Sequence, residues 1–198
     1  MINILIDIEA TGRTHESVFA VAIYVRAKKY NYSEVFYFPD NEDKRSENTM
    51  NWWMSNEKRK EFFEKSMLKC KENDKKTQIY KIRKFIDNIY KENEEIIFYS
   101  DFPVFDIGLV NSLLAEYDLL PLYLKDDSSA PSKVVNYNNY IKGVAKLYPY
   151  ESSKKAYEVI DLIRVKREES HDPLKDVESM MNEVDMILEK VKLLNYFK

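Results

Sequence analysis

Apolar residues cluster near the start of this 198-residue chain in short segments typical of β-strands. These segments are rich in Ile, Val, Phe and Tyr and are separated by short polar turns, which predicts strands at Ile2–Asp7, Val18–Arg26 and Tyr32–Phe38. Strands joined so closely tend to pair as antiparallel neighbours, so we expect a three-stranded meander. The apolar run within EEIIFYSD (residues 94–101) predicts a fourth strand, short and buried.

The pattern becomes helical from about Asn48 to Asn93, where apolar residues recur every three or four positions, with a turn expected at CKENDKKTQ (residues 70–78). The segment PVFDIGLVNSLLAEY (residues 103–117) predicts an amphipathic helix that begins at its proline. Two further helices are expected near the end, at Glu151–Arg167 and at Pro173–Asn195.

The segment from Leu119 to Asn139 has the least regular pattern, and we expect it to hold a fifth strand interrupted by a long loop. Neither an internal repeat nor a low-complexity linker divides the chain, so the prediction is one domain over residues 1–198. The fold class that these elements favour is mixed α/β, with one sheet covered by helices.

Composition narrows the class of protein. Hydrophobic residues make up 44% of the chain and charged residues 33%, a balance typical of a folded globular protein. The net charge of −3 excludes a broadly cationic surface, so any nucleic acid would be bound through local basic clusters or metal ions. Cys70 is the single cysteine, and no signal peptide or membrane-length apolar run is found, which favours a cytoplasmic protein without membrane contact.

Acidic residues stand where predicted buried elements end. Asp7 and Glu9 are two positions apart in DIEATG, so they share one face of the first strand. Asp106 and Asp176 each follow a proline by three residues, which places both in the first turn of a helix. An acid there can simply oppose the helix dipole, and Asp172 is best explained as a helix cap. A lone buried carboxylate is costly, however, unless a cation lies opposite it.

Three motifs occur together in a characteristic order: DIEATG, FDIG and HDPLKD. This set resembles the DEDDh branch of the DnaQ-like 3′–5′ exonucleases, and the resemblance extends from the first strand to the last helix. A fourth fragment, TMNWWMSN (residues 49–56), resembles the T-x-x-W-W segment of the sub-branch that includes mycobacterial-type exoribonucleases and phage exonucleases. The resemblance implies an RNase H-like fold, a mixed five-stranded sheet whose first three strands are antiparallel, flanked by helices.

The resemblance also implies a reaction, phosphodiester hydrolysis assisted by two divalent metal ions, Mg²⁺ or Mn²⁺. Hard cations of this kind prefer oxygen ligands. The carboxylates implied as ligands are Asp7, Glu9, Asp106 and Asp176. His171 is implied as the general base, a role that suits histidine because the ordinary pKa of an imidazole lies near neutrality. Backbone groups of Ala10 and Thr11 are implied to hold the terminal nucleotide.

The chain departs from the family pattern at one motif. Many relatives have a His-Asn pair before the acid of the second motif, whereas this chain has YSDFPVFD, which leaves Asp101 as an alternative to Asp106. The FDIG context favours Asp106, and Asp101 is expected to cap the helix that starts at Pro103. His15, in the loop after the first motif, is expected at the surface, with a substrate contact as the alternative.

Further substrate contacts are expected from aromatic and basic residues. Adjacent residues of a helix point about 100° apart, so one of Trp52 and Trp53 can enter the core while the other stacks on a base, and we select Trp53 as the candidate. Phe102 and Phe105 are expected in the core. Among the basic clusters, RVKR (residues 164–167) lies just before His171, so Arg164 is the candidate phosphate contact.

The leading hypothesis is a metal-dependent 3′–5′ exonuclease that acts on single-stranded ends of RNA or DNA. One alternative is a phosphodiesterase for very short oligonucleotides or nucleotide signals, and another is a silent relative that binds nucleic acid or protein. Against the silent relative, five clustered ionisable groups would repel one another and phosphate without cations. The apolar edge of ILEKVKLLNYF (residues 187–197) permits a homodimer, although such a stripe more often packs in the core.

Overall fold

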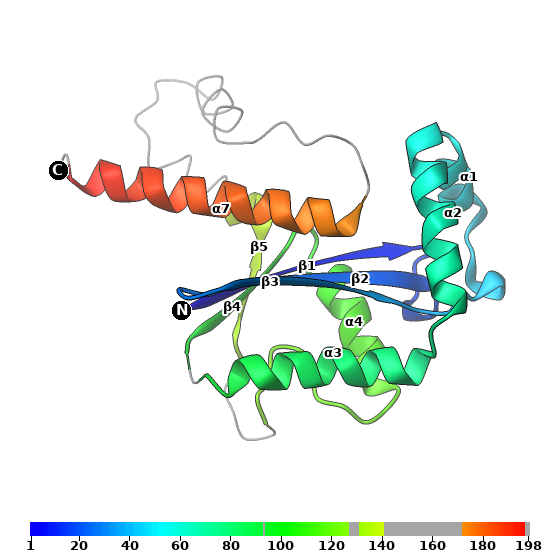
Figure 1. Cartoon of the computed structure of the whole chain (residues 1–198), viewed down its shortest axis with the longest axis horizontal. Coiled ribbons are helices and arrows are strands. Elements are labelled where there is room, and N and C mark those ends of the chain that lie inside the picture. Colours follow the sequence, from blue (N-terminus) through cyan, green and yellow to red (C-terminus); the bar gives the residue numbers. More distant parts are fainter. Residues whose placement is uncertain (93, 127–130, 141–171, 197–198) are drawn as a thin grey trace.

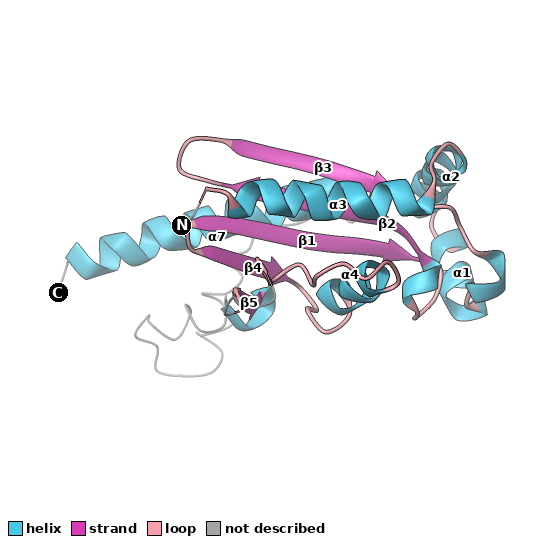
Figure 2. Cartoon of the chain, turned by 90° about the horizontal axis from the view of Figure 1, so that it is seen from below, coloured by secondary structure: helices cyan, strands magenta, loops and turns pink. Residues whose placement is uncertain are grey.

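The computed structural model describes residues 1–92, 94–126, 131–140 and 172–196, which form a mixed sheet with helices on both faces (Figure 1). The sheet has five strands in the order β3-β2-β1-β4-β5 (Figure 2). The strands are β1 (Ile2–Ala10), β2 (Val18–Arg26), β3 (Asn31–Tyr37), β4 (Ile96–Ser100) and β5 (Lys133–Asn136). All five correspond to strands that the hydrophobic pattern predicts.

The pairing of the strands confirms the predicted meander. β1 pairs with β2 and β2 with β3 in antiparallel register, whereas β4 lies parallel to β1 and β5 parallel to β4. β1 is therefore the central strand. It runs past the predicted end at Asp7 to Ala10, with an irregularity in the register between Glu9 and Ala10. Such an irregularity bends a strand and re-aims the side chains next to it.

Helical segments account for most of the remaining described residues. The α-helices are α1 (Glu47–Met54), α2 (Glu57–Lys71), α3 (Lys75–Tyr90), α4 (Asp106–Ala115) and α7 (Pro173–Tyr196), and two short 3₁₀ turns are η1 (His15–Ser17) and η2 (Glu42–Lys44). The turn expected at residues 70–78 separates α2 from α3. A second break was not expected: Asn56 separates α1 from α2, because its side chain accepts hydrogen bonds from the backbone of Lys58 and Arg59.

Two further elements differ from the prediction or fall outside the described residues. α4 begins at Asp106, three residues after the proline at which the helix was expected to start. Asp101 therefore does not occupy the cap position, which falls to Phe105. The helix expected at Glu151–Arg167 lies outside the described residues. Among the helices that the structure describes, none has both the length and the apolar character that crossing a membrane requires.

The alternation of β1 divides the core into two layers. Its even-numbered side chains pack against α3 and α4, and the residues of β1 in this layer are Ile2, Ile4, Ile6 and Ile8. Leu5 faces the opposite layer, where it packs with Met180 and Met181 of α7. α1 and α2 cover the far end of β2, where Trp53 and Phe63 enclose Phe19. Figure 1 shows α3 and α7 on opposite sides of the sheet.

The loop after β1 is closed by backbone contacts around Gly12. The amide of Thr11 donates to the carbonyl of Ser17 (2.9 Å), and the amide of Ser46 donates to the carbonyl of Thr11 (2.7 Å). A Cβ atom at Gly12 would lie 2.4 Å from the carbonyl oxygen of Lys44. Only glycine allows so close an approach, because a backbone oxygen cannot rotate away as a side chain can.

We therefore predict opposite effects from two glycine substitutions. Gly12→Ala should lower the free energy of unfolding by about 1–3 kcal/mol through overpacking. Gly108→Ala should raise it by about 0.5–1 kcal/mol, because Gly108 lies within α4 and its added Cβ would meet no atom within 4 Å. Urea unfolding of both variants beside the wild type tests this, and equal stability of the two would contradict it.

Candidate active site

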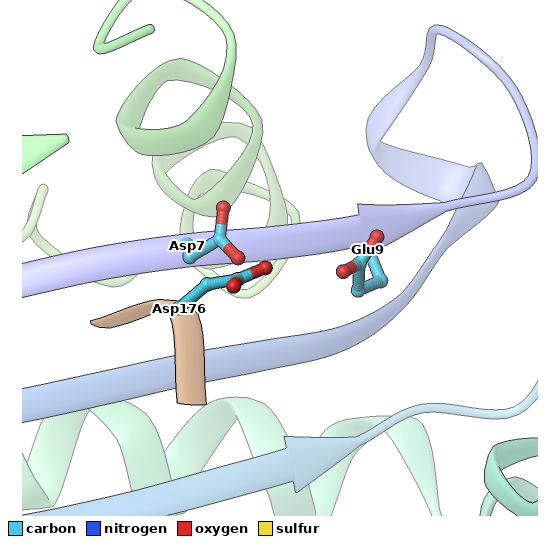
Figure 3. Close-up of side chains that lie close together, drawn as sticks. All are labelled: Asp7, Glu9 and Asp176. Carbon is cyan, nitrogen blue, oxygen red and sulfur yellow. The ribbon is translucent and has the colours of Figure 1, made fainter. Parts of the chain in front are cut away.

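Three carboxylates from distant parts of the chain meet at the end of β1. Asp7 and Glu9 project from β1 toward the face covered by α7, and Asp176 comes from the first turn of α7 (Figure 3). One ligand atom from each of the three lies within 4.8 Å of the others. The residues paired with Asp7 and Glu9 in β2 are Ala22 and Ala20, so no long side chain stands at those paired positions.

The start of α7 holds Asp176 in this position. The carboxylate of Asp172 accepts a hydrogen bond from the amide of Leu174 (3.1 Å), and the carbonyl of Asp172 accepts one from the amide of Asp176 (2.9 Å). Asp172 is therefore the helix cap that the sequence predicts. The amino end of α7 carries partial positive charge, which favours carboxylates nearby.

Asp106 lies beside this cluster, in the position expected for a fourth acid. It is the first residue of α4 and is buried, and its Oδ2 accepts hydrogen bonds from the hydroxyl of Ser100 and from the amide of Phe102. It does not belong to the trio within 4.8 Å, but its charge acts on Glu9. Asp101 is not among the groups that shift the pKa of Glu9, but its charge raises the pKa of Asp106, so the choice of Asp106 over Asp101 stays a prediction.

The charges at this site oppose one another. Burial raises the pKa of Glu9 well above its usual value, and the carboxylates of Asp7, Asp176, Asp106 and Asp172 raise it further, in that order. Burial also raises the pKa of Asp106 to about 6. Among the described residues, every charged group that shifts the pKa of Glu9 is thus another acid. A divalent cation would relieve this repulsion, and a set of carboxylate oxygens suits Mg²⁺ or Mn²⁺.

The two residues after Glu9 are engaged within the protein. Thr11 is fully buried, and its hydroxyl and amide both donate to the carbonyl of Ser17. The expected contact between Thr11 and a nucleotide is therefore wrong, because Thr11 has no exposed surface. The carbonyl of Ala10 accepts a hydrogen bond from Nε1 of Trp53 (3.1 Å). Ala10 is half-buried, and its contact with substrate stays a prediction.

One of the two adjacent tryptophans is buried and the other is exposed, as helix geometry predicts, but the exposed one is Trp52 and not Trp53. Trp53 is 1% exposed and packs against three phenylalanines, so its expected role as a stacking platform is wrong. Trp52 is 40% exposed, and the guanidinium carbon of Arg59 lies 4.4 Å from the centre of its ring. The pattern of the helix alone could not distinguish the two, since both orientations satisfy it.

An exposed apolar turn precedes Asp106 and was not predicted. Phe102 is 60% exposed and Val104 is 83% exposed, whereas Phe105 packs against the core. The expectation of a core position is therefore wrong for Phe102 and confirmed for Phe105. The two rings are stacked, with centres 6.3 Å apart. Residue pattern gives no signal for this, because exposure here depends on where the turn after β4 lies.

The remaining candidate residues lie apart from the cluster or beyond the described residues. His15 pairs with Glu116, the residue directly after α4. Nε2 of His15 lies 2.5 Å from Oε1 of Glu116, so this contact links η1 to the segment after α4. His15 has the partly exposed position expected of it, in a structural contact. His171 and Arg164 lie outside the described residues, and their roles stay predictions.

A mixed sheet of this order, with acids gathered at the end of its central strand, is the arrangement expected of an RNase H-like fold. The chain is similar to a solved structure of exonuclease I with bound product, with a TM-score of 0.64 and 11% sequence identity. The alignment covers 98% of this chain and 45% of that one, so this chain spans less than half of that protein. At this identity the likeness shows the fold alone.

The family is established by a match over nearly the whole chain. The model of the 3′–5′ exoribonuclease Rv2179c-like domain matches residues 2–188, so the chain belongs to this family of exonucleases. None of the curated proteins matches the chain. The resemblance seen in the motifs is thereby confirmed, and with it the class of enzyme.

The raised pKa values predict how the metal-free protein responds to pH. The folded state binds more protons than the unfolded state between the ordinary pKa of Asp106, 3.8, and its folded value of about 6. Stability should therefore fall as pH rises through this window. Asp106→Asn should flatten that part of the curve, whereas Asp43→Asn, on the exposed turn η2, should not. Urea unfolding in a chelator at several pH values measures both, and parallel curves for wild type and Asp106→Asn would contradict the prediction.

Proposed function

We propose that this protein removes nucleotides from the 3′ end of single-stranded RNA or DNA by metal-dependent hydrolysis. The observation that carries the proposal is the convergence of Asp7, Glu9 and Asp176, with Asp106 beside them. RNA is the first substrate to test, because the family is described as exoribonucleases.

Asp7, Glu9, Asp106 and Asp176 would hold two divalent ions such as Mg²⁺ or Mn²⁺. When bound, such ions supply an activated water, neutralise charge on the transferring phosphoryl group and stabilise the leaving oxygen. The protein itself fixes the positions of the ligands: β1 sets the spacing of two of them, and the cap at Asp172 orients a third. His171, just before that cap, would take the proton from the attacking water.

Substrate would approach the acids along surfaces that the structure leaves open. Trp52 and Phe102 are exposed aromatic side chains, and Phe102 is joined to Asp106 through its own amide. A base could stack on either ring, a contact that tolerates any sequence. Ala10 at the end of β1 and Arg164 before the HDPLKD motif are further proposed contacts.

The alternative functions differ in whether the acids must bind metal ions. A phosphodiesterase for very short oligonucleotides would use the same site and the same ions. A silent binding protein would keep a partly buried, mutually repelling set of carboxylates without a cation, which costs stability. The acids therefore favour an enzyme over a binding module.

We predict that the wild-type protein shortens a 5′-labelled single-stranded RNA from its 3′ end when Mg²⁺ or Mn²⁺ is present. Asp7→Asn should lower the rate by at least about a hundredfold, since it removes a charged ligand. Asp101→Asn is the matched control and should keep most of the rate. Gel analysis of RNA and DNA in parallel tests the preference as well, and failure to cleave either with either metal would overturn the proposal.

We also predict a specific defect for His171→Ala. Loss of a general base should lower kcat by roughly a hundredfold to ten-thousandfold. The increase in melting temperature caused by Mn²⁺ should remain, because the carboxylates are unchanged. Single-turnover kinetics and thermal unfolding measure the two effects, and a near-normal kcat would show that another group accepts the proton.

A further inference from the structure

A cleft of about 650 Å³ lies between β3, the middle of α2 and the start of α7. Its lining includes Val35, Tyr37, Phe62, Lys65, Lys69 and Asp172. α2 lies next to the end of β3, and α7 lies over the face of the sheet opposite to the one that α3 covers (Figure 1). None of the roles proposed above for substrate binding uses this cleft.

The register of the sheet connects the cleft to the acids. Glu9 pairs with Ala20, which pairs in turn with Tyr37, so these three side chains share one face of the sheet. Asp7 is connected to Val35 through Ala22 in the same way. Two strand spacings separate the floor of the cleft from the acids, a distance of about 10 Å. A strand of nucleic acid reaching the acids can therefore occupy the cleft within a few nucleotides.

The α2 wall of the cleft is cationic. Lys65 and Lys69 are one helical turn apart, so both lie on the same side of α2. Lys65 is paired with Glu61 on the exposed surface (2.6 Å). Lys69 donates to the hydroxyl of Tyr37 (3.2 Å), and its Nζ lies 4.7 Å from the centre of the Tyr37 ring. In the part of the chain that the structure describes, Lys69 forms no salt bridge, so its contacts hold the charge in place without neutralising it.

Aromatic surface accompanies these charges. The ring of Phe62 is stacked on Trp53, with centres 6.0 Å apart, and Trp53 is hydrogen-bonded to the carbonyl of Ala10 beside Glu9. Leu68, which also lines the cleft, is 65% exposed. A basic groove with aromatic side chains is the usual architecture for binding single-stranded nucleic acid without regard to sequence. Phe62 is thus connected through Trp53 to β1, the strand that carries Asp7 and Glu9.

The opposite wall is acidic at one point. Asp172 caps α7 one helical turn before Asp176, so it marks the end of the cleft nearest the acids. Phosphates avoid that end unless cations are bound there, and they are attracted to the α2 wall. The charge of the cleft therefore changes along its length, from lysines at the α2 wall to carboxylates at the end nearest the acids.

We propose that this cleft binds the single-stranded segment on the 5′ side of the scissile bond, with Lys65 and Lys69 contacting its phosphates. The inference rests on the proposed function and specifies its substrate: strands long enough to reach α2 are preferred over dinucleotides. Tyr37 and Phe62 contact the bases or riboses of the same segment.

The test compares the cleavage of two lengths of RNA by the wild type and by two double lysine variants. The first variant carries Lys65→Gln and Lys69→Gln, and the matched control carries Lys81→Gln and Lys84→Gln on α3, which packs on the opposite face of the sheet. The ratio of kcat/KM for an RNA of about a dozen nucleotides to that for a dinucleotide should fall about tenfold in the first variant. The control should keep the wild-type ratio, and Lys69→Arg should keep most of it.

Direct binding separates the cleft from the reaction. Anisotropy of a labelled RNA in Ca²⁺ or chelator should show weaker binding in the first variant, with a slope of log affinity against log salt shallower by roughly 1.4, about 0.7 for each lost phosphate contact. If the wild type cleaves RNA but both variants keep its ratio and affinity, the cleft proposal is overturned and the proposed function stands. If the wild type cleaves nothing, the binding comparison still decides, and equal affinities, or equal losses in the α3 control, overturn the cleft.

Discussion

The mutual repulsion of the carboxylates that surround the buried Glu9 is the constraint on which the site depends. Burial and four neighbouring acids all raise the pKa of Glu9, so each element that delivers an acid increases the cost of the metal-free arrangement. The sheet, α4 and α7 bear that cost through their own packing. A cation at this point turns the same repulsion into coordination, which explains why a protein would keep such a cluster.

Rigidity at the end of β1 follows from a few specific contacts. Trp53 packs among phenylalanines, and its Nε1 donates a hydrogen bond to the carbonyl of Ala10. Backbone hydrogen bonds join Thr11 to both Ser17 and Ser46. These contacts fix the backbone on the far side of Glu9, while the register with β2 fixes the near side. The same tryptophan supports Phe62 in the cleft beside α2. One buried ring therefore connects the acids to the surface where we place the substrate.

The sequence predicts the parts of this structure that local pattern controls. Alternation along β1, helix-start signals and motif order were sufficient to find the five strands, the cap at Asp172 and the acids Asp7, Glu9 and Asp176. Exposure was predicted less well, because it depends on tertiary packing. Trp53 was expected at the surface but is buried against α2. Phe102 was expected in the core but is exposed, because the chain forms a turn before α4 begins at Asp106.

The central claim is that the acids at the end of β1 form a metal centre, and anomalous diffraction from crystals grown with Mn²⁺ tests it most directly. We expect two anomalous peaks bounded by Asp7, Glu9, Asp106 and Asp176, and their loss in crystals of Glu9→Gln grown in the same way. An empty cluster at saturating Mn²⁺, or peaks only at other acids such as Asp101, would contradict it.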